Sequence, residues 1–142
     1  MNDERWNAIS PAECDSLLRQ NHLGRVAVVG DDLPLILPVN FVLDDDAVVF
    51  RTNPGSKLDA ALRDAPVAFE IDGIDERSQT GWSVLVRGHA HEVTDPVELD
   101  RLRQLDLVAW APGARTHYVR VTPVETTGRR ITVPSVPSVY WG

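Results

Sequence analysis

The sequence predicts a compact antiparallel β-barrel in a single domain. Its 142 residues fit one domain with one hydrophobic core. At least six segments have the apolar and β-branched composition of strands, and short turns rich in Gly, Pro and Asp join them. Few segments have the spacing of an amphipathic helix. Many short strands with few helices are typical of a small antiparallel barrel.

The predicted strands follow one another along most of the chain. Pro38 within the second strand marks an edge, a bulge or the approach of a ligand, and Gly88 predicts a bulge or bend in the fifth. Residues 1–133 are expected to form the domain and residues 134–142 a Pro-containing tail, whose Tyr140 and Trp141 suggest docking on a surface such as that of a second subunit. The strands are expected at 26–29, 35–42, 47–52, 67–72, 82–93 and 117–122, with residues 128–133 extending or following the last.

Two helices are predicted from their start signals. Ser10, Pro11 and Glu13 form a capping box, with the serine at the N-cap and the proline at the first helical position. Residues 95–98, Asp-Pro-Val-Glu, repeat this signal before a second helix. The buried stripes are expected at Cys14, Leu17 and Leu18 in the first helix, and at Leu99, Leu102 and Leu105 in the second.

The composition limits location and partners. The polar, acidic N-terminus has no signal-peptide core and no apolar run could span a bilayer, so we expect a cytoplasmic protein. The formal charge of −7 argues against nucleic-acid binding, which needs a basic face. A small anionic ligand stays compatible with this charge. The single Cys14 excludes an internal disulfide, and Lys57 is the only lysine.

Residues 48–62 carry the pattern most suggestive of chemistry. A strand ends at the turn Asn-Pro-Gly, and an amphipathic helix follows with Ser56 at its N-cap. Arg51, Thr52, Ser56 and Lys57 therefore converge on the start of a helix, as a phosphate monoester would require. The alternative is a common strand–turn–helix with solvated cations, in which Lys57 merely pairs with Asp59 or another acid.

No metal site is predicted. Residues 44–46 are three aspartates without the glycine and distal glutamate of a calcium loop, so they indicate a solvated turn. His89 and His91 share a strand face with Arg87 and have no fixed third ligand. No catalytic triad or acid–base pair is visible, and Glu70 and Asp72 alternate with apolar residues as solvent-facing side chains do. His117 is either a proton donor near a cofactor or part of the packing at the barrel rim.

Three motifs in order resemble the pyridoxamine 5′-phosphate oxidase-like family of FMN-binding split barrels. They are Pro-Val-Asn-Phe at 38–41, Phe-Arg-Thr-Asn-Pro-Gly-Ser-Lys at 50–57 and Gly-Trp-Ser-Val-Leu-Val-Arg-Gly at 81–88. The chain is most similar to the short bacterial branch that includes nitroimidazole-resistance-type proteins. This resemblance implies a six-stranded antiparallel split β-barrel of Greek-key type with a few short flanking helices. It also implies a homodimer with two FMN sites at the subunit interface.

The resemblance assigns roles to particular residues. Arg51, Thr52, Ser56 and Lys57 would hold the FMN phosphate and ribityl chain. Ser83 stands five residues before Gly88, where the family's oxidases carry a flavin-contacting glutamine. The isoalloxazine would be lined by backbone groups of Pro38, Val39 and Asn40, by Trp82 and Ser83, and by Trp110 of the partner chain, with Arg129 a weaker candidate. Trp82 and Trp110 are equally compatible with plain core or interface packing.

The function implied is that of an FMN-dependent oxidoreductase acting on a small substrate. The alternatives are use of the deazaflavin F420 in the same barrel, or a flavin carrier or sensor without turnover. The chain departs from pyridoxamine phosphate oxidases in two places. It lacks their basic segment at 38–40 and their Arg-x-His segment in the tail, which argues against oxidation of vitamin B6 itself. The catalytic residues are not identified from the sequence.

Overall fold

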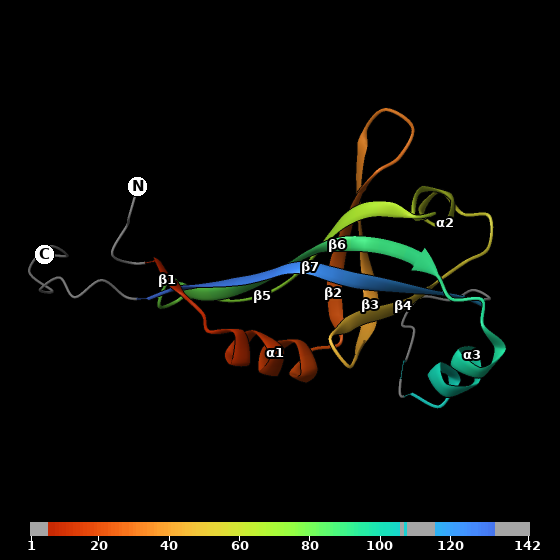
Figure 1. Cartoon of the computed structure of the whole chain (residues 1–142). Helices are drawn as coiled ribbons and strands as arrows, with labels where there is room; N and C mark the ends of the chain where they lie inside the picture. The colour runs from red at the N-terminus through yellow and green to blue at the C-terminus, as the bar shows by residue number, and fades with distance from the viewer. Residues whose placement is uncertain (1–5, 106, 108–115, 133–142) are drawn as a thin grey trace, which may run out of the picture.

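The computed structural model describes residues 6–105, 107 and 116–132 and shows a mainly β protein with three short helices (Figure 1). Trp110 and residues 133–142, which include the predicted tail at 134–142, lie outside the described residues. No described helix has the length and apolar character needed to cross a membrane. The elements are β1 (Trp6–Ala8), α1 (Pro11–Gln20), β2 (Leu23–Val29), β3 (Pro34–Asp44), β4 (Ala47–Thr52), α2 (Lys57–Ala61), β5 (Ala65–Asp75), β6 (Thr80–Glu92), α3 (Pro96–Arg103) and β7 (His117–Ile131).

The strands form the predicted six-stranded antiparallel barrel. The order is β7-β4-β3-β2-β5-β6, and pairing of β6 with β7 closes the barrel, while the short β1 adds to the edge of β7. Strands β2, β3 and β4 are successive neighbours, and β5 returns to lie beside β2. A fourth strand returning beside the first of three is the Greek-key arrangement.

The strands are longer than the sequence pattern indicated. β5 and β6 form a long hairpin paired from Ala65/Ala90 to Asp75/Thr80, and β7 is one continuous strand rather than two. The predicted irregularity at Gly88 is confirmed, because the β6–β7 register shifts between Arg87 and Gly88. A Cβ at Gly88 would collide with the backbone carbonyl of Thr122, so only glycine lets the two strands approach here.

The core fills the barrel with aliphatic and aromatic side chains from alternate strand positions. Phe41 and Phe69 pack edge to face with ring centroids 4.8 Å apart. Cys14 and Leu18 of α1 complete this core from one side, as the apolar stripe of that helix predicted. A second, smaller cluster lies under α3 and consists of Val49, Val93, Leu102 and Tyr118.

Of the two helices predicted from a Ser/Asp-Pro-x-Glu start, α1 has the expected N-cap hydrogen bond and α3 does not. The Ser10 side chain accepts a hydrogen bond from the backbone N–H of Glu13, so the predicted cap of α1 is confirmed. Asp95 occupies the N-cap position of α3 but forms no side-chain cap hydrogen bond. The fixed φ of Pro96 and packing of Leu102 therefore position this helix without the capping box.

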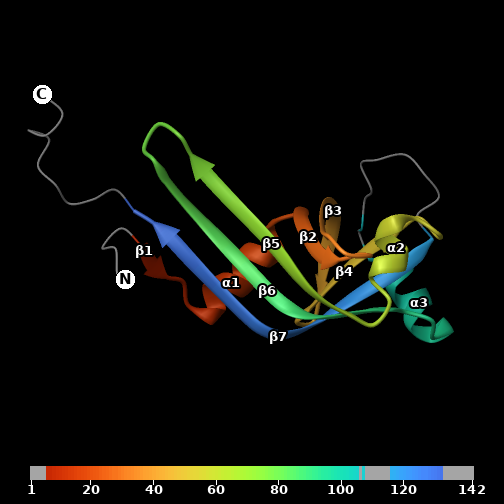
Figure 2. The same cartoon turned by 90° about the horizontal axis from the view of Figure 1, so that it is seen from above.

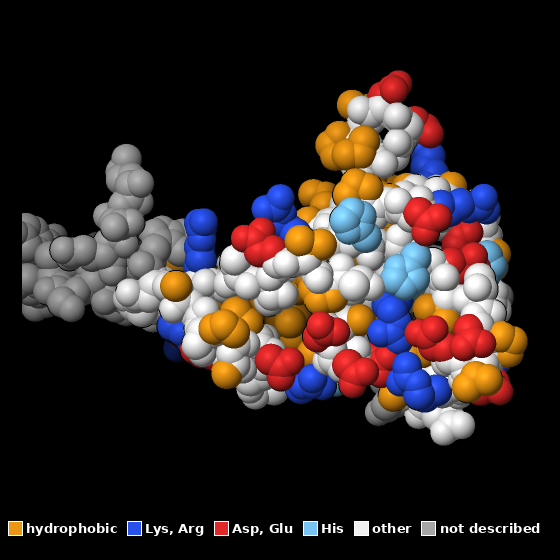
Figure 3. Space-filling view, in the orientation of Figure 1, with side chains coloured by type: hydrophobic (Ala, Val, Ile, Leu, Met, Phe, Trp, Pro, Cys, Tyr) orange, Lys and Arg blue, Asp and Glu red, His pale blue; other side chains and the backbone are white. Residues whose placement is uncertain are grey.

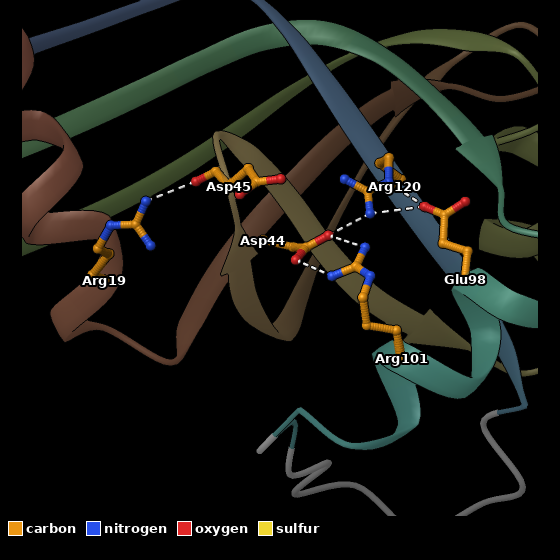
Figure 4. A network of polar contacts seen from close by, with 6 residues as sticks. All are labelled: Arg19, Asp44, Asp45, Glu98, Arg101 and Arg120. Atoms are coloured by element: carbon orange, nitrogen blue, oxygen red, sulfur yellow. Dashed lines mark hydrogen bonds and ion pairs between the residues drawn. The ribbon is translucent and has the colours of Figure 1, made fainter.

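A polar network fastens α3 to the barrel (Figure 4). The buried carboxylate of Asp44 accepts two hydrogen bonds from Arg101, at 2.6 and 2.8 Å, and another from Arg120 of β7. Glu98 of α3 binds the same Arg120 through Nε at 2.9 Å. The guanidinium groups lower the pKa of Asp44 to about 2, against the opposing effect of its burial. The aspartate turn is thus an anchor for a helix.

Candidate functional site

The predicted anion site lies where β4 ends and α2 begins. Ser56 is the N-cap of α2, and its hydroxyl oxygen accepts from the backbone N–H of Asp59 at 3.1 Å. Gly55 takes the left-handed conformation, φ +76°, that the turn before this cap requires. Arg51 lies near the end of β4 and Ser56 and Lys57 lie at the start of α2, so the turn holds these three residues at one end of the barrel.

Asp59 holds this turn together, which the sequence analysis did not foresee. Its buried carboxylate accepts from the Thr52 hydroxyl at 2.8 Å, the Gly55 backbone N–H at 3.0 Å and His117 Nδ1 at 2.9 Å. These three hydrogen bonds, with the charge of His117, lower the pKa of Asp59 although its burial alone would raise it. His117 Nδ1, which also lies 3.3 Å from Glu92 Oε1, connects β7 to the turn.

The hydrogen bonds divide the predicted phosphate ligands into two kinds. Thr52 gives its only hydroxyl hydrogen to Asp59, so it positions the turn and has no donor left for a ligand. Ser56 acts as an acceptor toward the helix, so its hydroxyl hydrogen stays available. In the described part of the chain Lys57 has no ion pair, so the suggested pair with Asp59 does not form.

Arg51 also has donor capacity to spare. One terminal nitrogen donates to the backbone carbonyl of Leu107 at 3.0 Å, and the guanidinium lies 5.9 Å from the ring centre of Tyr118. Its Nε is buried and finds no partner within residues 6–105, 107 and 116–132. The side-chain oxygen of Asn53 is likewise buried without a partner in those ranges. An unpaired buried donor and an unpaired buried acceptor two residues apart in the chain fit a ligand with both phosphate oxygens and hydroxyl groups.

The predicted ring-binding segment of β3 lies next to this turn. β3 pairs with β4 as far as Phe41 and Phe50, so Asn40 and Val39 lie just beyond the paired residues and beside the end of β4. Pro38 pairs with Arg25 of β2 on the other edge, where its missing N–H removes one ladder bond. Val39 is buried in the core, so only its backbone can reach a ligand.

Trp82 and Ser83 lie far from the turn in the same chain. Arg51 pairs with Tyr118 of β7, whereas Trp82 pairs with Arg130, twelve residues further along that strand, or roughly 40 Å of extended chain. Figures 1 and 2 show the tip of the β5–β6 hairpin and α2 at opposite ends of the molecule. A single chain therefore separates two groups that the sequence motifs assigned to one site.

A cavity of about 470 Å³ lies on the β5–β6 arm beside Trp82 and Ser83. Glu70 and Asp72 of β5 line it together with Ile74 and Ile131, so these acids are not simply solvent-facing as predicted. Burial raises the pKa of Glu70, the Asp72 carboxyl raises it further by hydrogen bonding and repulsion, and Arg25 opposes both. Together these effects raise the pKa of Glu70 to about 7, and the sequence analysis missed this pair of neighbouring carboxyls.

Two signals for the missed residues are present in the sequence. Glu70 and Asp72 are two apart on a strand and so share one face, which is a visible pattern. Asp59 stands at the third position of α2, where an acidic residue commonly caps the helix start. The link from Asp59 to His117 spans 58 residues and has no local signature.

Comparison with known proteins finds solved structures that share this architecture over most of the chain. An FAD binding protein from Mycobacterium smegmatis is 38% identical with a TM-score of 0.76, over 88% of this chain and 98% of its own. A conserved protein of unknown function from Corynebacterium diphtheriae is 33% identical with a TM-score of 0.75, over 90% and 99%. An uncharacterized protein of Mycobacterium tuberculosis is 38% identical over 128 residues, 87% of this chain and 84% of the relative.

The family follows from a match over most of the domain. The model of the family described as pyridoxamine 5′-phosphate oxidase matches residues 10–130. The chain belongs to this family, as the three motifs indicated.

Proposed function

We propose that this protein is a flavin-dependent oxidoreductase that binds its cofactor through the phosphate next to the ribityl chain. FMN and FAD share this phosphate, and a relative 38% identical over most of its length is called an FAD binding protein. The bound flavin would supply two-electron chemistry at its ring. The residues of this chain would bind its phosphate, orient its ring and shield it from water.

The observation that carries this proposal is the unused donor capacity at the turn after β4. Arg51 Nε is buried without a partner, the Ser56 hydroxyl hydrogen is free, and Lys57 forms no ion pair in the described residues. Leaving a buried charged donor unpaired costs free energy that an anionic ligand would recover. Charge-assisted hydrogen bonds from arginine and lysine suit phosphate oxygens. Thr52 would act by holding Asp59 rather than by touching the phosphate.

The predicted homodimer is part of this proposal. In one chain Arg51 and Trp82 pair with residues of β7 that are twelve positions apart, and this separation supports a site shared between two chains. A second copy would supply Trp82 and Ser83 to a flavin held on the first copy's turn. Hydrophobic side chains gather on the projecting β2–β3 hairpin, where Val29, Leu33 and Ile36 are 65–77% exposed (Figure 3). Such a patch is typical of a surface that a partner covers.

The binding experiment compares flavins with and without phosphate. Flavin-free protein is titrated with FMN, FAD and riboflavin, and flavin fluorescence gives each dissociation constant. Arg51→Ala and Lys57→Ala should each weaken FMN binding roughly ten- to a hundredfold and leave riboflavin binding unchanged. Arg63→Ala, at an exposed basic residue just after α2, is the matched control. Equal affinity for FMN and riboflavin would contradict a phosphate site at this turn.

A mixing experiment tests the shared site. Neither the double variant Arg51→Ala/Lys57→Ala nor the variant Trp82→Ala should bind FMN at the wild-type affinity. A mixed dimer would combine the intact turn of one chain with the intact Trp82 of the other and restore one wild-type site. Sites formed within single chains would give no restoration after mixing.

The two alternatives named from the sequence give different results. If the purified protein is colourless and binds F420 but neither FMN nor FAD, its cofactor is the deazaflavin rather than a flavin. A protein that binds flavin but is not reduced by NADH or NADPH, and whose photoreduced flavin is not reoxidised by an added electron acceptor, would be a carrier or sensor.

A further inference from the structure

Glu70 and Asp72 lie on the outer face of the sheet, on the same hairpin as Trp82 and Ser83. The strand register sets Pro38, Arg25 and Glu70 in one row across β3, β2 and β5, so Pro38 is two strand spacings, roughly 10 Å, from Glu70. In the next row Asp72 pairs with Ser83 of β6. The two carboxyls therefore lie beside Ser83, which would border the ring of a flavin held on the turn of a second copy.

The two acids share a single cation. Arg25 Nη1 lies 3.5 Å from Glu70 Oε1 and 3.3 Å from Asp72 Oδ2. The side chains of Glu70 and Asp72 are 34% and 30% exposed, at one side of the cavity. One arginine cannot neutralise two carboxylates, and a third acid, Glu76, lines the same cavity. On β6 the uncharged Leu85 pairs with Glu70 and the uncharged Ser83 pairs with Asp72, and Arg129 of β7 lies beyond Ser83 in the same row.

We propose that Glu70, paired with Asp72, is the proton donor of this cavity and that the substrate reduced here is an uncharged conjugated carbonyl compound. The inference rests on the proposed flavin function. The walls formed by Trp82, Ile74 and Ile131 suit a planar apolar molecule. The acids around them repel an anion. A protonated carboxyl near neutral pH is suited to donating to a developing oxyanion.

The proposed reduction is balanced by the flavin and this one carboxyl. A reduced flavin bound here would supply a hydride, which carries both electrons and one hydrogen nucleus. The carbonyl oxygen takes the second hydrogen from Glu70, whose O–H bond breaks. The Glu70 carboxylate then regains a proton from water at the open side of the cavity. Asp72 acts as a positioning residue, because it holds the Glu70 proton without giving it to the substrate.

The first test measures the carboxyl directly in flavin-free protein. Infrared or ¹³C NMR titration should show one glutamate titrating near pH 7, absent in Glu70→Gln and displaced to lower pH in Asp72→Asn. Glu125→Gln, at an exposed residue that pairs with Arg87 outside the cavity, is the control and should leave this titration unchanged. A Glu70 that titrates in the ordinary range of a glutamate would overturn the inference.

The second test follows proton delivery with 1,4-benzoquinone as the acceptor. Photoreduced, flavin-loaded protein is mixed with the quinone, and flavin reoxidation is recorded between pH 5 and 9. The wild-type rate should fall as pH rises through 7, and Glu70→Gln should be about a hundredfold slower with a flat profile. Asp72→Asn should keep Glu70 as the proton donor and move the fall in the reoxidation rate to lower pH.

The outcomes separate this inference from the proposed function. A protein that binds flavin but has the same pH profile in wild type and Glu70→Gln overturns only the role of Glu70. Failure to bind any flavin overturns both.

Discussion

Asp44 of β3 and Glu70 of β5 are two carboxyls of one barrel whose pKa values shift in opposite directions. Asp44 is the more buried, yet two arginines bind it and its pKa falls to about 2. Glu70 is about one-third exposed, but it shares one arginine with a second acid and its pKa rises to about 7. Burial acts in the same direction on both. The number of cations per carboxyl, rather than depth, therefore decides which acid is an anchor and which can exchange a proton.

The largest expected effect comes from removing the anchor. Asp44→Asn should lower the free energy of unfolding at pH 7 by about 2–3 kcal/mol, because Arg120 loses a charged partner in a largely buried position. Urea unfolding measures this. Asp45→Asn is the matched control, since Asp45 is exposed, binds Arg19 through its backbone carbonyl, and has a φ of 54° that asparagine tolerates.

The pH dependence of this effect has a definite sign. The pKa of Asp44 is lowered in the folded state, so its contribution is fully present above the ordinary aspartate pKa near 4 and is lost as pH falls toward 2. Wild type and Asp44→Asn should therefore approach equal stability in acid. A difference that persists unchanged at pH 2 would show that shape rather than charge makes Asp44 an anchor.

A smaller effect of opposite sign is expected at Glu70. Its raised pKa means that the folded state binds more protons than the unfolded state between about pH 4.5 and 7, so stability falls as pH rises through this window. Glu70→Gln should be more stable than wild type by about 1 kcal/mol at pH 8, a figure reduced for solvent screening, and equal to it at pH 4. Thermal unfolding at both pH values measures the difference. If Glu70→Gln is less stable than wild type at pH 8, the raised pKa of Glu70 in the folded state is contradicted.

The smallest effect is expected from the shared arginine. Arg25→Gln should raise the pKa of Glu70 by roughly half a pH unit, because it removes the one group that opposes burial and Asp72. NMR titration of the glutamate carboxyl detects this shift. Arg87→Gln removes a similar exposed arginine that pairs with Glu125, and it should leave the pKa of Glu70 unchanged.

The clamp-like turn after β4 was predictable because its information is local. Arg51, Ser56 and Lys57 lie within seven residues, and strand alternation, the Asn-Pro-Gly turn and a serine N-cap fix their positions from the sequence alone. The same pattern overstated Thr52, whose hydroxyl binds a buried acid instead of facing a ligand. Sequence identifies which residues come to a turn, while hydrogen-bond partners decide which of them keep a free donor.

The partners of the charged residues were not predictable in this way. Asp44 binds Arg101 and Arg120, which lie 57 and 76 residues away, and a turn of three aspartates gives no sign of either. Glu70 and Asp72 were visible as two residues on one strand face. Their common arginine, their cavity and the neighbouring Ser83 depend on the register of β2, β5 and β6. A shift of that register by one residue would turn each of these side chains to the other face.

The sequence by itself determined the barrel, its short helices, the turn that begins α2 and the family. These follow from periodicity, turn chemistry and capping, which act over a few residues. Only the tertiary structure decided how charges are paired and which carboxyl holds a proton near neutral pH. Electrostatic free energy depends on distances between strands and on exclusion of water, and these exist only once distant segments are packed together.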